Sequence, residues 1–379
     1  MKINLKFKNN FLKITKTTIS DIIFANFVLV DLLRFFTIIP LTLGNLLYLI
    51  LGVISIVYTI IIKGFKQMNV EYLFLLIYSF FGVLGFIYNR NMDFIEILWP
   101  FAFLGLAILF LNFNISKKLT KYTYYFVSFL FIIKIILSKN VNDLNIVASR
   151  NSINLVLLIY FSLYVISRNN KNKEGYLFPI LLGFIVSVLS IGRSGVLTFG
   201  LLLFMYIIYS NNNISSLRKL FFIIIKLVLV SIFLFITYEI FEIYILKAVN
   251  NFLQRGFDSI RTIIWYEYIM ISISNIKNFL FGSPIRGTSL LNQFSHNLHN
   301  SFLMLHAKYG IFILFLILLM ILNTYRFLFR KRNYMLIILF IVILFRMQFD
   351  YTNFNAQLDI VFYYYLFIPF KKNCVNSLY

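Results

Sequence analysis

Apolar segments follow one another along nearly the whole chain of 379 residues, separated by polar connections. They are too continuous for the amphipathic helices of a soluble protein, and most could cross the roughly 30 Å of hydrocarbon in a bilayer. Open sheet edges cannot be satisfied in lipid. The pattern therefore predicts an all-α fold, a polytopic membrane helical bundle of about twelve transmembrane helices. The expected spans are residues 18–39, 41–62, 70–88, 94–112, 122–138, 152–167, 176–191, 195–210, 219–240, 301–324, 334–347 and 357–370.

One long polar interruption divides this pattern, at residues 241–300. We expect three parts: the first nine transmembrane helices in residues 1–240, a large extracytoplasmic loop in residues 241–300, and the last three helices with a cytoplasmic tail in residues 301–379. Within the loop, residues 257–274 are expected to form an interfacial helix. No repeat or linker divides the chain further.

Composition and charge support a membrane protein and give its orientation. Hydrophobic residues make up 61% of the chain and charged residues 13%, too little polar surface for a soluble globule of this size. Basic clusters fall on every second connection, on the side of the basic amino terminus, which is therefore the cytoplasmic side. The net charge of +22 follows from this topology, so no nucleic-acid binding is expected. The first span, which carries Asp31 and Arg34, is expected to be retained and not cleaved as a signal peptide.

All three histidines lie in or next to the 241–300 loop, and His299 has the most informative position. It precedes an expected helix that Ser295, Asn297 or Asn300 could cap. The free N–H groups of a helix start attract anions and keep an imidazole neutral, which suits a general base beside an anion site. His296 and His306 are each expected to be hydrogen-bonded structural histidines.

A metal site is the competing interpretation of the three histidines, and ligand supply argues against it. No Asp or Glu occurs between Glu267 and Asp350, and the only cysteine, Cys374, lies in the expected cytoplasmic tail. The chain has no dinucleotide-binding or P-loop motif. We expect neither a metal nor a cofactor.

Several arginines do not follow the topology rule. Arg193 lies in a turn between two spans, and its guanidinium could bind phosphate oxygens or anchor the helix hairpin at the headgroups. For Arg90, Arg150 and Arg346 the anchor interpretation is favoured.

The interfacial helix carries Arg261, Trp265 and Tyr268 on one face, and Asp258 could pair with Arg261.

The order of these motifs resembles the O-antigen polymerase and O-antigen ligase family. The similarity covers residues 189–317: a turn containing Arg193, a long loop with Arg261 and Trp265, a Gly/Pro segment, and the run HNSFLMLHAKYG opening a membrane helix. The resemblance implies a GT-C-like membrane glycosyltransferase, acting at the outer face of the cytoplasmic membrane on oligosaccharides carried by polyprenyl pyrophosphate.

Site residues follow from the resemblance together with the chemistry. Arg193, Arg261 and the His299–Asn300 pair match the family's motifs, whereas Lys308 stands where an acidic residue is frequent and residues 282–287 have fewer glycines. We expect His299 to be the general base and Arg261 and Arg193 to hold the pyrophosphate. The further substrate-binding candidates are Arg286, Arg255, Trp265, Asn300 and His306. Tyr266 and Tyr268, with Trp265, could also offer flat surfaces to sugar rings or lipid.

The expected function is a surface-polysaccharide polymerase that moves a lipid-linked glycan chain onto a lipid-linked repeat unit, with the site facing the periplasm or the cell exterior. Its partners would be the polyprenyl pyrophosphate-linked oligosaccharide, membrane lipid, and flippase and chain-length regulator proteins. One alternative is a ligase that moves the glycan to a lipid A core or another acceptor. Another is a flippase or transporter, against which stands the small number of charges within the expected spans, namely Asp31, Arg34, Lys134 and Lys226.

Overall fold

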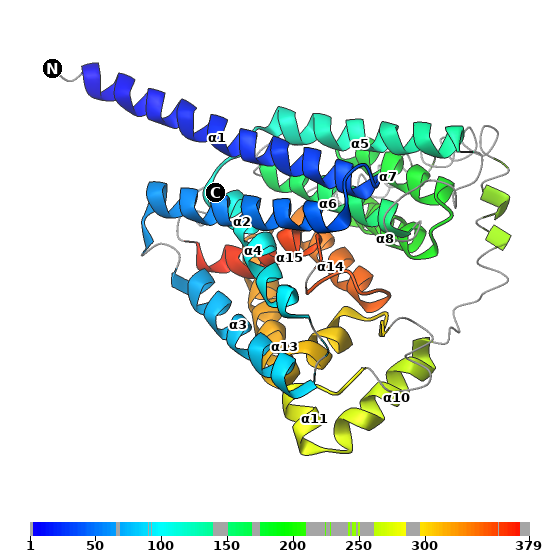
Figure 1. Cartoon of the computed structure of the whole chain (residues 1–379). Helices are drawn as coiled ribbons and strands as arrows, with labels where there is room; N and C mark the ends of the chain where they lie inside the picture. Colours follow the sequence, from blue (N-terminus) through cyan, green and yellow to red (C-terminus); the bar gives the residue numbers. More distant parts are fainter. Residues whose placement is uncertain are drawn as a thin grey trace.

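The computed structural model describes residues 3–65, 69–89, 91, 93–138, 151–168, 175–209, 261–285, 296–354 and 356–371, with single positions between 224 and 250. Every element that Figure 1 labels is a helix. In the first half these are α1 (Ile3–Phe35), α2 (Leu41–Lys63), α3 (Asn69–Asn89), η2 (Phe94–Leu98), α4 (Trp99–Asn112), α5 (Lys117–Leu137), α6 (Asn151–Ser167), α7 (Leu177–Leu189) and α8 (Arg193–Tyr209). In the second half they are α10 (Arg261–Ile273), α11 (Ile276–Phe281), α13 (Ser301–Arg330), α14 (Tyr334–Gln348), α15 (Asp359–Phe367) and η4 (Ile368–Phe370).

Helix lengths agree with a multi-pass membrane protein. Among the described residues, five helices are long and apolar enough to cross a membrane: Leu41–Lys63, Asn69–Asn89, Ile95–Asn112, Lys117–Leu137 and Ser301–Arg330. Shorter apolar helices occupy Asn151–Ser167, Leu177–Leu189, Arg193–Tyr209, Tyr334–Gln348 and Asp359–Phe370. The all-helical membrane class is thus confirmed. The total of about twelve stays a prediction, and most of the expected 219–240 span lies outside the described residues.

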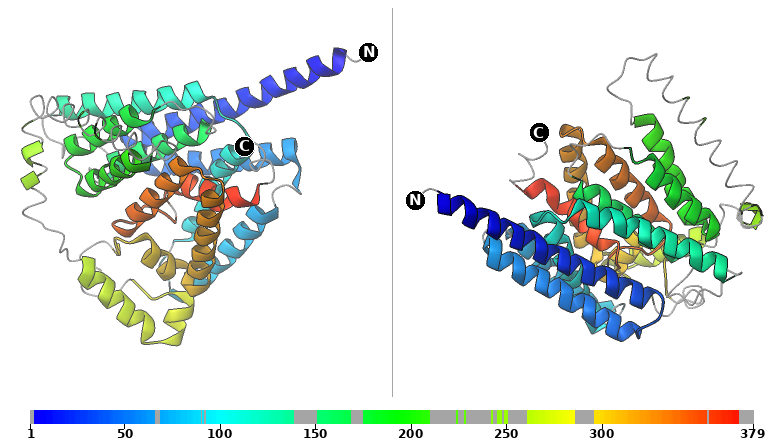
Figure 2. Two further views of the ribbon diagram at one scale, coloured as in Figure 1. Left: turned by 180° about the vertical axis from the view of Figure 1, so that it is seen from behind. Right: turned by 90° about the horizontal axis from the view of Figure 1, so that it is seen from above.

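Figures 1 and 2 show α1, α2 and α5 side by side along one flank, while α10 and α11 extend from the opposite end of the molecule. Helix α4 packs between α2 and α15, and its backbone touches that of α2. A Cβ built on Gly105 would lie 2.2 Å from the carbonyl oxygen of Gly52, and one on Gly52 would lie 2.4 Å from that of Ala102. Small residues at such a crossing allow helices to approach closely, as is common in membranes.

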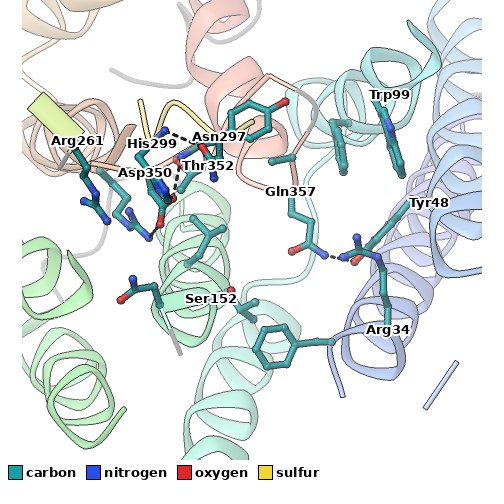
Figure 3. Close-up of a pocket in the computed structure, with 18 residues that line it drawn as sticks. Arg34, Tyr48, Trp99, Ser152, Arg261, Asn297, His299, Asp350, Thr352 and Gln357 are labelled. Atoms are coloured by element: carbon teal, nitrogen blue, oxygen red, sulfur yellow. Dashed lines mark hydrogen bonds and ion pairs between the residues drawn. The ribbon is translucent and has the colours of Figure 1, made fainter. Parts of the chain in front are cut away.

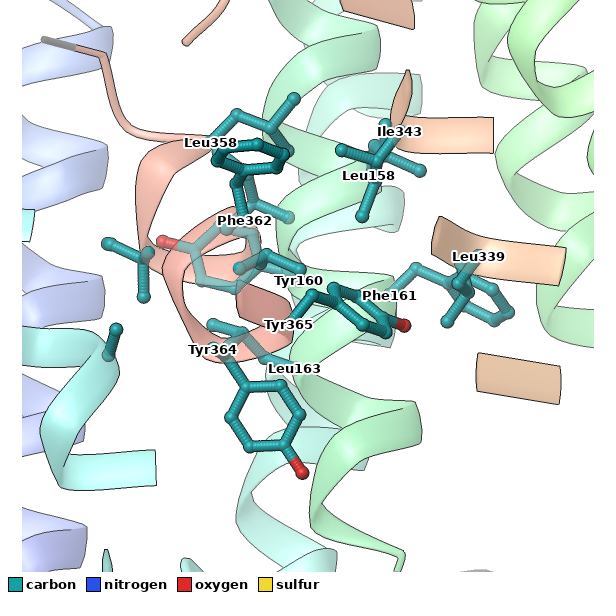
Figure 4. Packing of buried hydrophobic residues seen from close by; sticks show 14 of the residues in the cluster. Leu158, Tyr160, Phe161, Leu163, Leu339, Ile343, Leu358, Phe362, Tyr364 and Tyr365 are labelled. Atoms are coloured by element: carbon teal, nitrogen blue, oxygen red, sulfur yellow. The ribbon is translucent and has the colours of Figure 1, made fainter. Parts of the chain in front are cut away.

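The interior of the bundle is formed by α6, α14 and α15, whose apolar side chains interlock (Figure 4). All nine residues of α15 are buried. The outer helices instead expose apolar side chains, among them Ile61 at 73%, Leu76 at 70% and Leu137 at 74%. In water such surfaces would drive aggregation, but in a bilayer they face lipid.

Helix α13 changes direction at Gly310, whose φ of 78° interrupts the helical backbone. A Cβ at Gly310 would lie 2.2 Å from the carbonyl oxygen of Leu280, so the glycine lets α11 pack directly on the kink. The 30 residues of α13 span roughly 45 Å, more than the hydrocarbon core needs. Its first turns therefore belong with α10 and α11, next to the candidate site.

Candidate functional site

A cavity of about 600 Å³ lies where several helices begin or end (Figure 3). It is lined by Arg34, Phe35, Tyr48, Trp99, Phe103, Asn151, Ser152, Leu155, Val156, Arg261, Asn297, His299, Arg346, Asp350, Tyr351, Thr352, Ala356 and Gln357. The polar groups gather at two ends. One end holds His299, Asp350, Arg346 and Arg261, and the other holds Arg34, Tyr48 and Gln357 beside Trp99.

His299 is held in a turn that leads into α13. Its φ is 50°, a left-handed conformation, and its backbone N–H donates to the Asn297 side chain at 2.8 Å. Asn300 caps α13, because its side-chain oxygen accepts from the N–H groups of Phe302 at 2.9 Å and Leu303 at 3.2 Å. Of the three expected capping residues, Asn300 is therefore confirmed. The expectation of free N–H groups beside His299 needs correction, because the cap occupies two of them.

Asp350 is the residue that completes this end of the cavity. Its Oδ1 lies 3.5 Å from Nδ1 of His299, and its Oδ2 lies 3.3 Å from Nη2 of Arg346. Burial raises the pKa of Asp350, but the nearby His299 ring and the charges of Arg346 and Arg261 outweigh burial and lower that pKa below its usual range. Asp350 is therefore a carboxylate at neutral pH, placed to orient the His299 ring.

Arg346 corrects the anchor interpretation. Its side chain is 2% exposed and faces the cavity instead of the headgroups. Its Nη2 donates a hydrogen bond to Asp350. Its Nε and Nη1 are buried without a hydrogen-bond partner among the described residues. Buried donors in that state are rare and call for a ligand or water that accepts from them. Arg90 and Arg150 lie outside the described residues.

Arg261 reaches the same end from the start of α10. Its Nη1 donates to the carbonyl oxygen of Phe349 at 2.7 Å, directly before Asp350 in the chain. This contact fixes the guanidinium against the loop that carries Asp350. Asp258, the expected partner of Arg261, lies outside the described residues.

The loop between α14 and α15 is described at residues 349–354 and 356–358, and neighbouring side chains hold it in place. The Ser301 hydroxyl donates to the carbonyl oxygen of Asp350 at 2.9 Å and accepts from the backbone of Thr352 at 3.0 Å. Asp359 accepts from the N–H of Phe354 at 2.7 Å.

Lys308 supports the same loop through the Tyr351 hydroxyl at 3.0 Å, while pairing with Glu96 at 2.5 Å. Lys308 therefore has structural partners of its own in this protein.

At the opposite end, a buried carboxylate organises the lining. Asp31 is 1% exposed and accepts hydrogen bonds from the hydroxyls of Tyr48 and Tyr160 and, at 2.6 Å, from the Gln357 amide. Arg34 donates from Nε to the Asn45 side chain at 2.9 Å and lies 5.6 Å from the centre of the Tyr48 ring. In the sequence, this end of the cavity is indicated by Asp31 and Arg34, two charged residues inside an apolar span, which often mark a functional site.

The start of α6 adds to the positive potential of the cavity. Asn151 and Ser152, its first two residues, line the cavity, so the helix directs its positive end there. Three arginines line the cavity, whereas the acidic groups at the site are Asp350 and the buried Asp31, so the net charge of the site is positive and favours binding of an anion.

The remaining expected site residues lie elsewhere. Trp265 donates from Nε1 to the carbonyl oxygen of Leu298 at 2.7 Å, and Asn300 is the cap described above. His306 is 5% exposed, with the Tyr268 hydroxyl 2.6 Å from one ring nitrogen and the carbonyl oxygen of Phe279 2.9 Å from the other. These contacts join α10 and α11 to the start of α13.

Arg193 begins α8 but is not part of the cavity lining. Its turn nevertheless packs on the start of α6, since a Cβ on Gly192 would lie 3.0 Å from the Asn151 oxygen. Arg255 and Arg286 lie outside the described residues. Within the described part of the chain, no three His, Cys, Asp or Glu side chains come together as metal ligands.

Comparison of the chain with protein-family models gave no match, and neither the curated proteins nor the solved structures gave a significant one.

Proposed function

We propose that the protein is a membrane glycosyltransferase that moves a glycan from polyprenyl pyrophosphate to an acceptor hydroxyl, and that it polymerises a surface polysaccharide. The observation that carries the proposal is Arg346, which is 2% exposed, lines the cavity and has two buried guanidinium nitrogens without partners among the described residues. A pyrophosphate would accept hydrogen bonds from these nitrogens and balance the positive charge.

The His299–Asp350 pair supports the chemistry. The acceptor oxygen attacks the anomeric carbon, the bond from that carbon to the phosphate oxygen breaks, and the polyprenyl pyrophosphate leaves with the bonding electrons. Because Nδ1 of His299 faces Asp350, Nε2 is the nitrogen we assign to take the acceptor proton. Asp350 then stabilises the imidazolium, while Arg346 and Arg261 stabilise the charge that develops on the leaving group.

The position of the cavity supports action at the outer face of the cytoplasmic membrane. Its lining comes from the end of α1, the starts of α2, α4 and α6, the segment before α13 and the loop after α14. Under the topology expected from the basic clusters, all of these lie on the side opposite the cytoplasm. A lipid-linked substrate with its pyrophosphate at the interface could enter there from the bilayer.

The motif order in residues 189–317 supports the choice of a polymerase, because it resembles the O-antigen polymerase and ligase family. In this proposal Arg261 keeps its expected role and Arg346 joins it. The cavity lends no support to Arg193 as a direct ligand.

The test is to delete the gene, restore it with variants, and resolve the surface glycans by size on a gel. His299→Ala should not restore the ladder, and single repeats should remain attached to their acceptor. His296→Ala is the matched control, because His296 lies in the same turn but does not line the cavity, and it should restore the ladder. Acceptor without any glycan would identify a ligase instead, and a full ladder with His299→Ala would refute the site.

A flippase is distinguished by reconstitution. Purified protein in vesicles with lipid-linked repeat units on both leaflets should release polyprenyl pyrophosphate as longer glycans form. Movement of the substrate between leaflets without that release would refute the transferase proposal.

A further inference from the structure

The end of the cavity that holds Arg34 is not used by the proposed chemistry. His299, Asp350, Arg346 and Arg261 occupy the other end, and Figure 3 shows Trp99, Tyr48, Arg34 and Gln357 on the far side of the lining. A cavity of about 600 Å³ is larger than a pyrophosphate needs. The far end therefore has room for a second part of the substrate.

Aromatic rings form one wall of this end. Trp99 lies parallel to Phe103, with the ring centres 5.5 Å apart and an angle of 8° between the planes. Phe103 in turn packs on Tyr48 at 6.1 Å. Phe103 is 2% exposed, whereas Trp99 is only half-buried, so part of the indole faces the cavity. The wall offers a flat apolar surface whose orientation is fixed by the ring behind it.

Polar groups of fixed orientation lie beside this wall. Gln357 donates from Nε2 both to Asp31 at 2.6 Å and to the Tyr48 hydroxyl at 2.5 Å. The hydrogen bond from Arg34 to Asn45 uses Nε, and the two terminal nitrogens have no hydrogen-bond partner within the described residues. Asp31 is fully buried behind these groups and accepts from three donors. Because Tyr48 donates its hydroxyl proton to Asp31 and both N–H groups of Gln357 are used, the donors left for a ligand are the terminal nitrogens of Arg34, and the Gln357 side chain is held in place before any ligand arrives.

We propose that Trp99 and Arg34 form a sugar subsite, supported from behind by Tyr48 and Gln357, in which a pyranose ring of the lipid-linked glycan stacks on Trp99. A pyranose presents C–H bonds on one face and hydroxyl groups around its edge, so it matches a flat aromatic surface with the Arg34 guanidinium at its border. The inference rests on the proposed function and deepens it. One end of the cavity takes the pyrophosphate, and the other takes a sugar of the chain being extended.

The first experiment uses the tryptophan content of the chain. Trp99 and Trp265 are the only two tryptophans, so Trp265→Phe leaves Trp99 as the sole source of tryptophan emission. The probes are the oligosaccharide released by mild acid from the cell's own lipid-linked repeat unit, and inorganic pyrophosphate. The oligosaccharide should change Trp99 emission in a saturable way. No change at saturating oligosaccharide would overturn the subsite, and this measurement needs no substitution at Trp99.

The second experiment compares variants in reconstituted vesicles. Trp99→Leu should raise KM for the lipid-linked repeat unit roughly ten-fold, the loss expected for one aromatic contact. Trp99→Phe, which keeps a ring, should change KM by less than about three-fold. Phe80→Leu is the control, because Phe80 is a lipid-exposed ring at 60% exposure. Unchanged binding of inorganic pyrophosphate shows that the Trp99→Leu variant is folded.

The two proposals fail differently. Transfer that depends on His299 but is insensitive to Trp99→Leu, with no response of Trp99 emission, refutes the sugar subsite and leaves the transferase intact. Oligosaccharide binding at Trp99 without any glycan transfer supports the subsite and refutes the transferase.

Discussion

Removing Asp350 should destabilise the protein through the arginine that it leaves behind. Arg346 is 2% exposed, and among the described residues Asp350 is its hydrogen-bond and ion-pair partner. Breaking a buried ion pair by removing one partner costs about 3–5 kcal/mol, because the remaining charge is uncompensated. The Asp350 side chain is 21% exposed and the cavity admits water. We therefore expect Asp350→Ala to cost about 3 kcal/mol, at the lower end of that range.

The partner substitution gives the decisive comparison. Arg346→Met fills similar space without a charge, so the double variant Arg346→Met/Asp350→Ala should recover most of the lost stability, to within about 1 kcal/mol of the parent. The assay is reversible unfolding of the purified protein in mixed micelles by an ionic detergent, followed by tryptophan fluorescence. Additive losses in the double variant, or a loss below about 1 kcal/mol for Asp350→Ala, would refute the argument.

The pH dependence has a defined sign. Because the pKa of Asp350 is lowered in the folded protein, its stabilisation is fully present above the unfolded value of about 3.9 and is lost as pH falls toward the folded value. The stability difference between the parent and Asp350→Ala should therefore persist down to about pH 5 and shrink below about pH 4. A difference that shrinks between pH 7 and pH 5 would contradict the ion pair.

Three further substitutions test other parts of the structure. Arg346→Lys keeps the charge but loses the planar fork, so binding of inorganic pyrophosphate, measured by calorimetry, should weaken about ten-fold. Gly105→Ala puts a Cβ 2.2 Å from the Gly52 oxygen and should cost about 1–3 kcal/mol of unfolding free energy, whereas Gly175→Ala, with its nearest contact at 3.8 Å, should cost less. Asn300→Ala removes the cap of α13 and should cost about 1 kcal/mol in the same detergent titration, and its full stability would argue against the cap.

The helices could be predicted because their signal is local. An apolar run bounded by polar residues specifies a membrane helix without reference to the rest of the chain. The expected 41–62 and 152–167 spans differ from α2 and α6 by one residue at an end. Helix α1 contains the first part of the expected 18–39 span and extends before it to Ile3, but it ends at Phe35, four residues earlier than that span.

The candidate site could be predicted only where its signal was local. The turn before α13 and its cap were visible in the sequence, and so was His299. Trp99 begins α4, whereas Asp350 and Gln357 lie in the loop between α14 and α15, so their place beside the cavity depends on how α4, α13, α14 and α15 pack. No spacing rule connects residues across such distances, so the aromatic wall has no signal in the sequence, whereas Arg346 and Asp350 stand four residues apart and their pairing is a local signal.

The loop between α14 and α15 has a consequence for how the two ends of the cavity respond to ligands. One short segment carries Asp350 at its start and Gln357 near its end, and Ser301 and Asp359 fasten its backbone between them. A ligand that shifts Asp350 or Gln357 should therefore also shift the other residue, because the two lie on one short backbone segment. Filling of one subsite should alter the affinity of the second by the same factor in both directions.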